Sequence, residues 1–417
     1  MRVLYVVGSC LTKNTSANMS HNAYVQGLLE NGCDVDILMA KDSWGQQDSK
    51  LPTWKLARYY CYRSNAPHDK FRTWARNLLP SQTIDNGSCA GSSISSAQKV
   101  PQKGTSVEHG VSARVRSGIK RLYYYFFPVD PLYPLNRYWL KNASRFKSSS
   151  VYDLVVSNSS PAASHKLVQL LLQSKRLSCK RWIQIWEDPW YADLYSSRKP
   201  DIYQEEHALL TAADEIYYVS PLTLKYQKEL FPDCGKKMKH IPLPYLDFAE
   251  EEGSPKMSFG YFGDYYSHTR NLLPFYQALQ DSGCVGSIYG DSDLNLESSE
   301  RITVSGRVTL DVLSSVQAET GVLVHLCNLR GGQIPGKIYH YSATKKPILF
   351  ILDGTEEEQR IIHSYFSRFN RYYFCQNTTG SIMRAMKQIC SDSCEGDLVF
   401  LPVEEFRPQT IVKFLLK

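Results

Sequence analysis

The chain has 417 residues, of which 43% are hydrophobic and 21% charged, and its formal net charge is +7. This length is too great for one ordinary hydrophobic core and predicts two or three domains. The composition lies near the average of soluble globular proteins, so the chain can bury substantial cores without disulfides or metals. No stretch reaches the roughly 18 apolar residues that a membrane-spanning helix needs.

The first residues and the cysteines bear on the cellular compartment. Residues 1–8 contain one short apolar run and no small-residue cleavage site, which indicates a first strand rather than a signal peptide. The 11 cysteines are scattered, with no CxxC pair and no histidines at zinc spacing. We therefore expect reduced, mostly buried thiols in a cytoplasmic protein.

A basic and aromatic segment covers residues 113–147. Its cations are Arg114, Arg116, Lys120, Arg121, Arg137, Lys141, Arg145 and Lys147. Two interpretations stay open. Basic side chains beside aromatics suit an anionic membrane surface, which would place the protein at the inner face of the cytoplasmic membrane. Alternatively, the aromatics belong to the core and the cations line a solvated helix face. Binding of single-stranded nucleic acid is the least favoured interpretation.

Strand and helix patterns alternate in the first half of the chain, which predicts a parallel sheet covered by helices. The expected strands are residues 3–7, 35–39, 153–157, 181–186 and 216–219. Helices are expected from about Ser20 to Gly32, over 164–172, and from Pro221, with Ser220 as the N-cap. The polar stretch 80–112 predicts a flexible insertion.

A second series begins after a proline-punctuated segment at 240–244 and an acidic run at 250–253, which predicts domains 1–245 and 246–417. Its expected strands are 258–262, 287–289, 322–326 and 347–352. Helices are expected over 272–279, from Pro335, near Glu356 and Thr379, and over 407–417, the last packing back toward the first domain. The predicted fold class is α/β, with two Rossmann-like domains facing across a cleft that binds the ligand.

The most informative segment runs from Asn328 to Tyr341. A predicted buried strand ends just before it, Gly331 and Gly332 allow close backbone approach, and Pro335 suits the first turn of a helix. The amides at a helix start attract anions, and Lys337 adds a positive charge, so this turn suits a diphosphate. A routine strand-to-helix turn is the alternative.

The run from Ile334 to Leu349 resembles the donor-site block of family 4 glycosyltransferases, which reads roughly Pro-x-Lys-x-x-Glu-Tyr-x-Ala-x-x-Lys-Pro-Ile. The segments 182–190 and 213–221 are similar to two further motifs of that family, a strand with an Asp-Pro-Trp loop and an Ala-Asp-x-Ile-x-x-Val-Ser strand. The resemblance implies the GT-B fold. It also implies transfer of a sugar from a nucleoside-diphosphate sugar with retention at the anomeric carbon.

The resemblance further implies site residues. In the family, a glycine approaches the leaving diphosphate and a basic residue neutralises it, and Gly263 and Arg270 match them here. Arginine suits phosphate oxygens because its planar fork binds them bidentately. The implied donor-binding set is Gly263, Arg270, Gly306, Arg307, Gly331, Gly332, Ile334, Pro335, Lys337 and His340. Asp188 follows a predicted buried strand at the cleft and is expected to orient an acceptor hydroxyl or the donor sugar, so the predicted catalytic residues are Asp188, Arg270 and Lys337. The acceptor side comprises Ser16, Asn18 and His21, whose loop contributes to the cleft in the family, and Trp190, whose ring suits stacking on a sugar.

Two positions depart from the family. Its members usually carry a glutamate that holds the donor ribose where this chain has His340, and many carry another glutamate where it has Gly332. A histidine can bond to hydroxyls but lacks the two acceptor oxygens of a carboxylate. The sequence therefore leaves open a catalytically silent protein that binds a sugar nucleotide or a partner enzyme.

The favoured function is a glycosyltransferase that extends a glycan or lipid-linked acceptor in bacterial surface polysaccharide synthesis. No cofactor is expected apart from the nucleoside-diphosphate sugar as co-substrate. The triplet Asp291-Ser292-Asp293 has the spacing of a metal motif, but it lies in an expected loop outside the cleft, so metal independence is predicted. A nicotinamide-dependent oxidoreductase would share the fold, but no GxGxxG follows the first strand.

Overall fold

The computed structural model describes residues 1–41, 46–47, 51–54, 57–64, 132–194, 198–246, 256–395 and 399–417. The predicted insertion at 80–112, residues 113–131 of the basic segment and the acidic run at 250–253 lie outside this part of the chain. Contacts divide the chain into two compact units. The first comprises Met1–Asn18, Asp34–Gln184 and Trp190–Asp214, and the second comprises Met19–Cys33, Ile185–Pro189 and Glu215–Lys417. The boundary near residue 245 stays a prediction.

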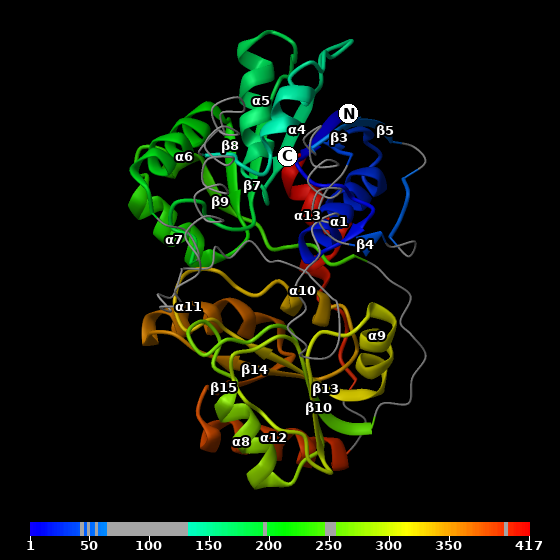
Figure 1. Ribbon diagram of the computed structural model, residues 1–417, viewed down its shortest axis with the longest axis vertical. Helices are drawn as coiled ribbons and strands as arrows, with labels where there is room; N and C mark the ends of the chain where they lie inside the picture. Colours follow the sequence, from blue (N-terminus) through cyan, green and yellow to red (C-terminus); the bar gives the residue numbers. More distant parts are fainter. Residues whose placement is uncertain are drawn as a thin grey trace, which may run out of the picture. The chain divides into compact units, whose positions relative to one another are not determined.

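Two parallel, Rossmann-like sheets form the framework and confirm the α/β fold class (Figure 1). The first has the strand order β5-β3-β1-β6-β7-β8-β9, and the second has the order β12-β11-β10-β13-β14-β15. Their registers are parallel, with Val3 opposite Val35 in the first sheet and Phe259 opposite Gly286 in the second. A small antiparallel sheet joins β2 (Lys13–Asn14) to β4 (Gln46–Gln47).

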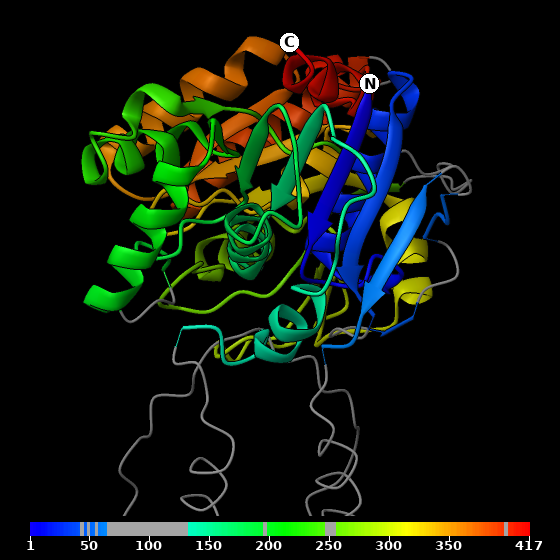
Figure 2. The same cartoon turned by 90° about the horizontal axis from the view of Figure 1, so that it is seen from above.

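The strands of the first sheet are short. They are β1 (Arg2–Val7), β3 (Asp34–Ala40), β5 (Arg58–Tyr62), β6 (Leu154–Asn158), β7 (Trp182–Trp186), β8 (Glu215–Tyr218) and β9 (Met238–His240). Figure 2 shows the blue strands β1, β3 and β5 side by side. A parallel strand is covered on both faces, which is why β1 is a continuous apolar run with no exposed residue from Val3 to Val7. All five predicted strands are confirmed, and β5 and β9 were not predicted.

The described part of the basic segment contains the helix α4 (Arg137–Ala143), whose burial bears on the two interpretations of that segment. Trp139 and Phe146 are buried, whereas Lys141, Arg145 and Lys147 are exposed. Trp139 and Phe146 thus pack in the core while these three cations face solvent, and Arg137 and Tyr138 are half-buried. No helix in the described ranges is long and apolar enough to cross a membrane.

Two further helices accompany the first sheet. The predicted helix at 164–172 is confirmed by α5 (Ala163–Gln173). The helix α6 (Pro200–Ala212) was not predicted, because it buries only Glu206, Leu209 and Leu210 and shows little apolar periodicity.

The helix α1 (Ser16–Glu30) ends before Gly32, whose φ of +74° is the left-handed conformation expected after a helix. Most of α1 belongs to the second unit, as does the C-terminal helix α13 (Pro408–Leu415), which packs on it. Gly27 permits this approach, since a Cβ there would lie 2.2 Å from the Pro408 carbonyl oxygen. The Asn31 side chain also donates to the Gln409 carbonyl at 2.9 Å.

The second sheet lies wholly in the second unit. Its strands are β10 (Lys256–Phe262), β11 (Gly286–Tyr289), β12 (Ile302–Ser305), β13 (Thr320–Leu326), β14 (Ile348–Leu352) and β15 (Tyr372–Gln376). Its helices are α8 (Leu273–Ser282), α9 (Leu310–Glu319), α10 (Lys337–Tyr341), α11 (Glu356–Phe366) and α12 (Thr379–Glu395). Residues of α8 and α12 share one core with the sheet, including Phe259, Phe275, Val324 and Ile382. The strands predicted for this series are confirmed, and β12 and β15 were not predicted.

The starts of three helices differ in how they are capped. Ser220 caps α7 (Pro221–Leu230), because its side chain accepts from the amides of Leu222 and Thr223. Thr309 stands at the N-cap of α9, but its side chain makes no capping hydrogen bond. The predicted helix start at Pro335 is wrong, since α10 begins at Lys337 and has only five residues. So short a helix has little dipole, which weakens the anion attraction predicted for the amides at this helix start.

Candidate functional site

The carboxyl end of β10 gathers several of the predicted residues. The Phe262 carbonyl accepts from Lys337 Nζ and from the Tyr341 hydroxyl, the latter at 3.5 Å. The next amide, that of Gly263, donates to the Tyr289 carbonyl at 2.8 Å and is thereby fixed beside the end of β11. Residues that follow β10, β11 and β12 meet at this edge because parallel strands end on the same side of a sheet.

Lys337 is a largely buried cation in the first turn of α10. Burial, together with the charges of Arg270 and Arg307, lowers the pKa of Lys337 to about 8, although the charge of Asp264 opposes the shift. Among the described residues, its ammonium group bonds a carbonyl and forms no ion pair with a carboxylate. A buried cation without a counter-ion is unfavourable, and a bound anion would relieve it.

Arg270 lies in the polar loop after β10 and donates to the Tyr261 hydroxyl. Its Nε atom is buried and has no hydrogen-bond partner. Within the described ranges it makes no ion pair with a carboxylate, so the alternative of a surface salt bridge is not what the structure shows there. Burial and then the charge of Arg270 lower the pKa of His325 to about 3, which places this cation close to the end of β13.

Arg307 differs from the other two cations because its side chain is already paired. Its guanidinium donates to both oxygens of Asp264, at 3.0 Å for Nε to Oδ1, and Nε also lies 3.2 Å from Asp291 Oδ2. Burial opposes ionisation of Asp264, but the bonds from Arg307 and from the Asp291 amide hold the pKa of Asp264 below its ordinary value. The Arg307 amide donates to Asp291 Oδ1 at 3.2 Å.

The turn at Gly331 and Gly332 is held by several neighbours within the second unit. Gly331 has a φ of +86°, and its amide donates to Glu358 at 3.0 Å. A Cβ on Gly332 would lie 2.7 Å from the Thr223 backbone, and the Gly332 carbonyl accepts from the Ser220 hydroxyl. The start of α7 therefore fills the space that a side chain would need, so a glutamate cannot stand at position 332 in this arrangement.

The remaining residues of this loop lead into α10. Ile334 is buried, and the Pro335 carbonyl accepts from the Ile338 amide at 3.3 Å. His340 is partly buried, and burial followed by the charge of Lys337 lowers the pKa of His340 to about 4. The imidazole is therefore neutral near pH 7 and could exchange hydrogen bonds with hydroxyls, but it brings no negative charge.

Asp188 is hydrogen-bonded to the loop that precedes α10. Its Oδ1 atom accepts from the Gln333 side chain at 2.6 Å. His21, predicted on the acceptor side, lies 3.6 Å from Glu187 through Nδ1 and is fully buried. Burial and then the adjacent charge of Asp188 raise the pKa of Glu187 well above its ordinary value. The second unit thus brings Asp188 and His21 close to each other in space, with Asp188 bonded to the predicted donor loop.

The other acceptor-side residues belong to the first unit. Ser16 is exposed at the start of α1. The Asn18 side chain donates to the carbonyls of Cys10 and Lys13, at 3.0 and 2.8 Å, and so fixes the loop before α1. Trp190 packs on the Tyr133 ring at 5.1 Å between centroids. Their acceptor roles stay predictions, although Asn18 and Trp190 have evident structural ones.

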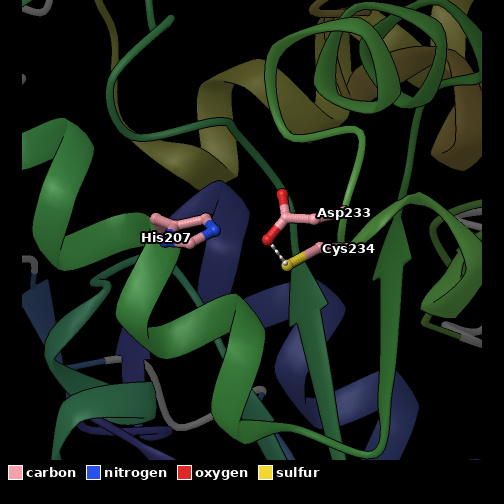
Figure 3. A group of neighbouring side chains, drawn as sticks. All are labelled: His207, Asp233 and Cys234. Atoms are coloured by element: carbon pink, nitrogen blue, oxygen red, sulfur yellow. Dashed lines mark hydrogen bonds between the residues drawn. The ribbon is translucent and has the colours of Figure 1, made fainter.

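Figure 3 shows a small group of potential metal ligands at another place. The Cys234 thiol donates to the carboxylate of its neighbour Asp233 at 3.9 Å, and both belong to the second unit. His207, which the figure also labels, belongs to the first unit. We infer no metal site from these residues.

The sequence missed two carboxylates of this region. Asp264 directly follows the predicted Gly263, but its pairing with Arg307, 43 positions away, has no signature in a single sequence. Glu358 was detectable in part, since Thr355 and Glu358 have the Thr-x-x-Glu spacing of a capping box. The hydrogen bond that Glu358 accepts from the Gly331 amide has no such local signature in the sequence.

The sequence matches no protein-family model and no curated protein. Among solved structures, the chain is similar to a glycosyltransferase from Rickettsia africae, with 10% identity, a TM-score of 0.47, and coverage of 99% of this chain and 93% of that chain. A UDP-N-acetylglucosamine 2-epimerase shows 11% identity, a TM-score of 0.45 and coverage of 100% and 94%.

Arabidopsis thaliana UGT89C1, in a complex with UDP, shows 11% identity, a TM-score of 0.45 and coverage of 99% and 94%. These likenesses establish neither an activity nor a substrate for this chain.

Proposed function

We propose that this chain is a glycosyltransferase that uses a nucleoside-diphosphate sugar, with the diphosphate bound in the second unit. The observation that carries the proposal is the pair Arg270 and Lys337 at the carboxyl end of β10. Both are cations that form no ion pair with a carboxylate in the described part of the chain, and one of them has a lowered pKa. A diphosphate would supply the missing negative charge to both.

The proposed reaction breaks the bond between the anomeric carbon and the diphosphate oxygen and forms a bond from that carbon to an acceptor hydroxyl oxygen, with retention. The hydroxyl proton leaves with the diphosphate. Negative charge grows on the diphosphate as the first bond breaks, so Arg270 and Lys337 would stabilise the transition state more than the bound donor. In this scheme His340 bonds a donor hydroxyl, and Asp188 orients the donor sugar or the acceptor.

Several finer parts of the proposal are supported by the sequence alone, either by its patterns or by the family resemblance. They are the GT-B arrangement of an acceptor domain at 1–245 and a donor domain at 246–417, a glycan or lipid-linked acceptor, a role in bacterial surface polysaccharide synthesis, and a cytoplasmic location at the inner face of the membrane. They remain proposals.

Calorimetric titration with a panel of nucleoside diphosphates and their sugars tests the donor site. Arg270→Ala and Lys337→Ala should each weaken binding by about 10- to 100-fold, since a charge-assisted hydrogen bond contributes about 1.5–3 kcal/mol. Arg301→Ala is the matched control, because this exposed arginine of the second unit donates, among the described residues, to the Gly283 carbonyl alone. Near-normal binding by both alanine variants would remove the proposed diphosphate site.

A donor-binding protein without transferase activity is the second candidate, and the absence of a glutamate at positions 332 and 340 favours it. Incubation of the wild-type protein with a donor that binds, followed by measurement of released nucleoside diphosphate, separates the two. An active enzyme should release it, and chelator should leave the rate unchanged because no metal is proposed in the mechanism. Tight donor binding with no release in the presence of candidate acceptors would favour the silent protein.

A further inference from the structure

Glu358 is a buried carboxylate that the proposed reaction does not use. It is 5% exposed and stands at the third position of α11, after the N-cap Thr355. Its Oε2 atom accepts from the Thr355 amide at 2.8 Å, while the Thr355 hydroxyl accepts from the Glu358 amide at 3.3 Å. These two bonds form a capping box, which engages only one of the two carboxylate oxygens.

The other oxygen, Oε1, accepts hydrogen bonds from two segments outside α11. It accepts from the Gly331 amide at 3.0 Å and from the Tyr226 hydroxyl of α7 at 3.1 Å. Burial, and then the charge of Glu358, raise the pKa of Tyr226 to about 12, so the phenol stays protonated and keeps donating. One carboxylate therefore ties α11, α7 and the loop after β13 together.

The bond to Gly331 falls where the chain turns toward Lys337. Gly331 has a left-handed φ of +86°, and the next residue has no room for a side chain beside Thr223. Gln333, two residues on, bonds Asp188. The orientation of Gly331 thus sets the path of the segment that carries Gln333 and Lys337. Because the Gly331 amide is bonded by Glu358, it is not free to bind a phosphate itself.

From this geometry we infer that Glu358 is a positioning residue, which fixes the Gly331 turn and thereby holds the donor-binding segment 331–337 ready for its ligand. The consequence for ligand binding rests on the proposed function. The positioning of the turn does not, and it can be measured without any ligand.

The variant that tests this role most directly is Glu358→Gln. Glutamine has the same shape and also forms capping boxes, so α11 should keep its start. It has only one acceptor oxygen, however, and its amide group would face either the Thr355 amide or the Gly331 amide as donor against donor. Glu357→Gln is the matched control, because Glu357 is exposed, carries the same charge in the same turn and pairs with Lys225 of α7. Among the described residues it forms no hydrogen bond to the loop.

Hydrogen–deuterium exchange of the unliganded variants measures the turn directly. We expect exchange in peptides covering residues 327–336 to be at least tenfold faster in Glu358→Gln than in the wild type, and unchanged in Glu357→Gln. Equal exchange in the two variants would overturn the inference. If Glu358→Gln does not fold, Tyr226→Phe, which removes one bond to the same oxygen and leaves the helix cap intact, should raise exchange of the same peptides, and unchanged exchange would overturn the inference.

Calorimetric titration with UDP and GDP then separates this inference from the proposed function. If the wild type binds either nucleotide, Glu358→Gln should bind it at least tenfold more weakly and Glu357→Gln within about twofold of the wild type. Unchanged affinity in Glu358→Gln would overturn the positioning role. A wild type that binds no nucleoside diphosphate at all would count against the proposed function, while the exchange measurement would still decide the role of Glu358.

Discussion

Lys337 shows how one buried cation affects the stability of the molecule. Burial lowers the pKa of Lys337 from 10.5 to about 8, so between these values the unfolded chain binds more protons than the folded one. Stability therefore rises with pH across that window, and the destabilising effect of Lys337 is fully present below pH 8. Lys337→Met should raise the free energy of unfolding at pH 7 by about 1–3 kcal/mol.

Urea denaturation from pH 7 to pH 10 checks this prediction. The difference between the Lys337→Met and wild-type curves should shrink as the pH rises, since the native lysine loses its charge. Lys345→Met, at an exposed position nearby, serves as the control and should show no such trend. A difference that stays constant with pH, or that grows, would show that the ammonium group of Lys337 is not the source of the destabilisation.

At the same scale, the sequence was informative about residue types and uninformative about their partners. Arg270 was predicted from the resemblance and Lys337 from its place at the predicted turn, and the structure places both beside the end of β10. Arg307 was predicted with them, yet Asp264 pairs with its side chain. A single sequence shows which side chains carry charge, but long-range pairing depends on which loops the sheet brings together.

At the scale of elements, the strongest apolar patterns were predicted well and the weaker ones were missed. Residues 3–7 of β1 and all of β14 are buried runs of apolar residues, which is the pattern of a parallel strand. The strand β12 has only one buried residue, so no apolar run marked it. The late start of α10 has a different cause, because Pro335 is equally compatible with a loop and with a first helical turn.

The helix N-termini show the same contrast between features that the sequence predicts and features that it does not. Ser220 was predicted as a cap from the Ser-Pro pair alone, and the structure confirms it. The capping box of α11 has a local signature as well, but the second oxygen of its glutamate reaches Gly331, 27 positions earlier. Local hydrogen bonds are therefore predictable from sequence, whereas the tertiary bonds that give an element its functional position are not.

At the scale of the whole molecule, the predicted donor-binding residues share a compact unit with two residues of the predicted first domain. All of them, from Gly263 to His340, fall in the second compact unit, and so do Asp188 and His21, which come from the first half of the chain. The unit is thus assembled from three separate stretches of sequence, which composition and periodicity alone do not indicate.

This distribution predicts which peptides a bound donor fragment should protect from hydrogen–deuterium exchange. A nucleoside diphosphate without a sugar should slow hydrogen–deuterium exchange in peptides of the second unit, above all after β10 and in segment 327–341, because its charges would contact Arg270 and Lys337. Peptides of β1, β3 and α5, in the first unit, should exchange as in the free protein. Ligand binding lowers the population of open states by mass action, so the effect should grow with ligand concentration. Protection that centres on the first unit would place the nucleotide elsewhere and contradict the donor site, while Arg270→Ala, which weakens binding, should abolish the protection at the same concentration.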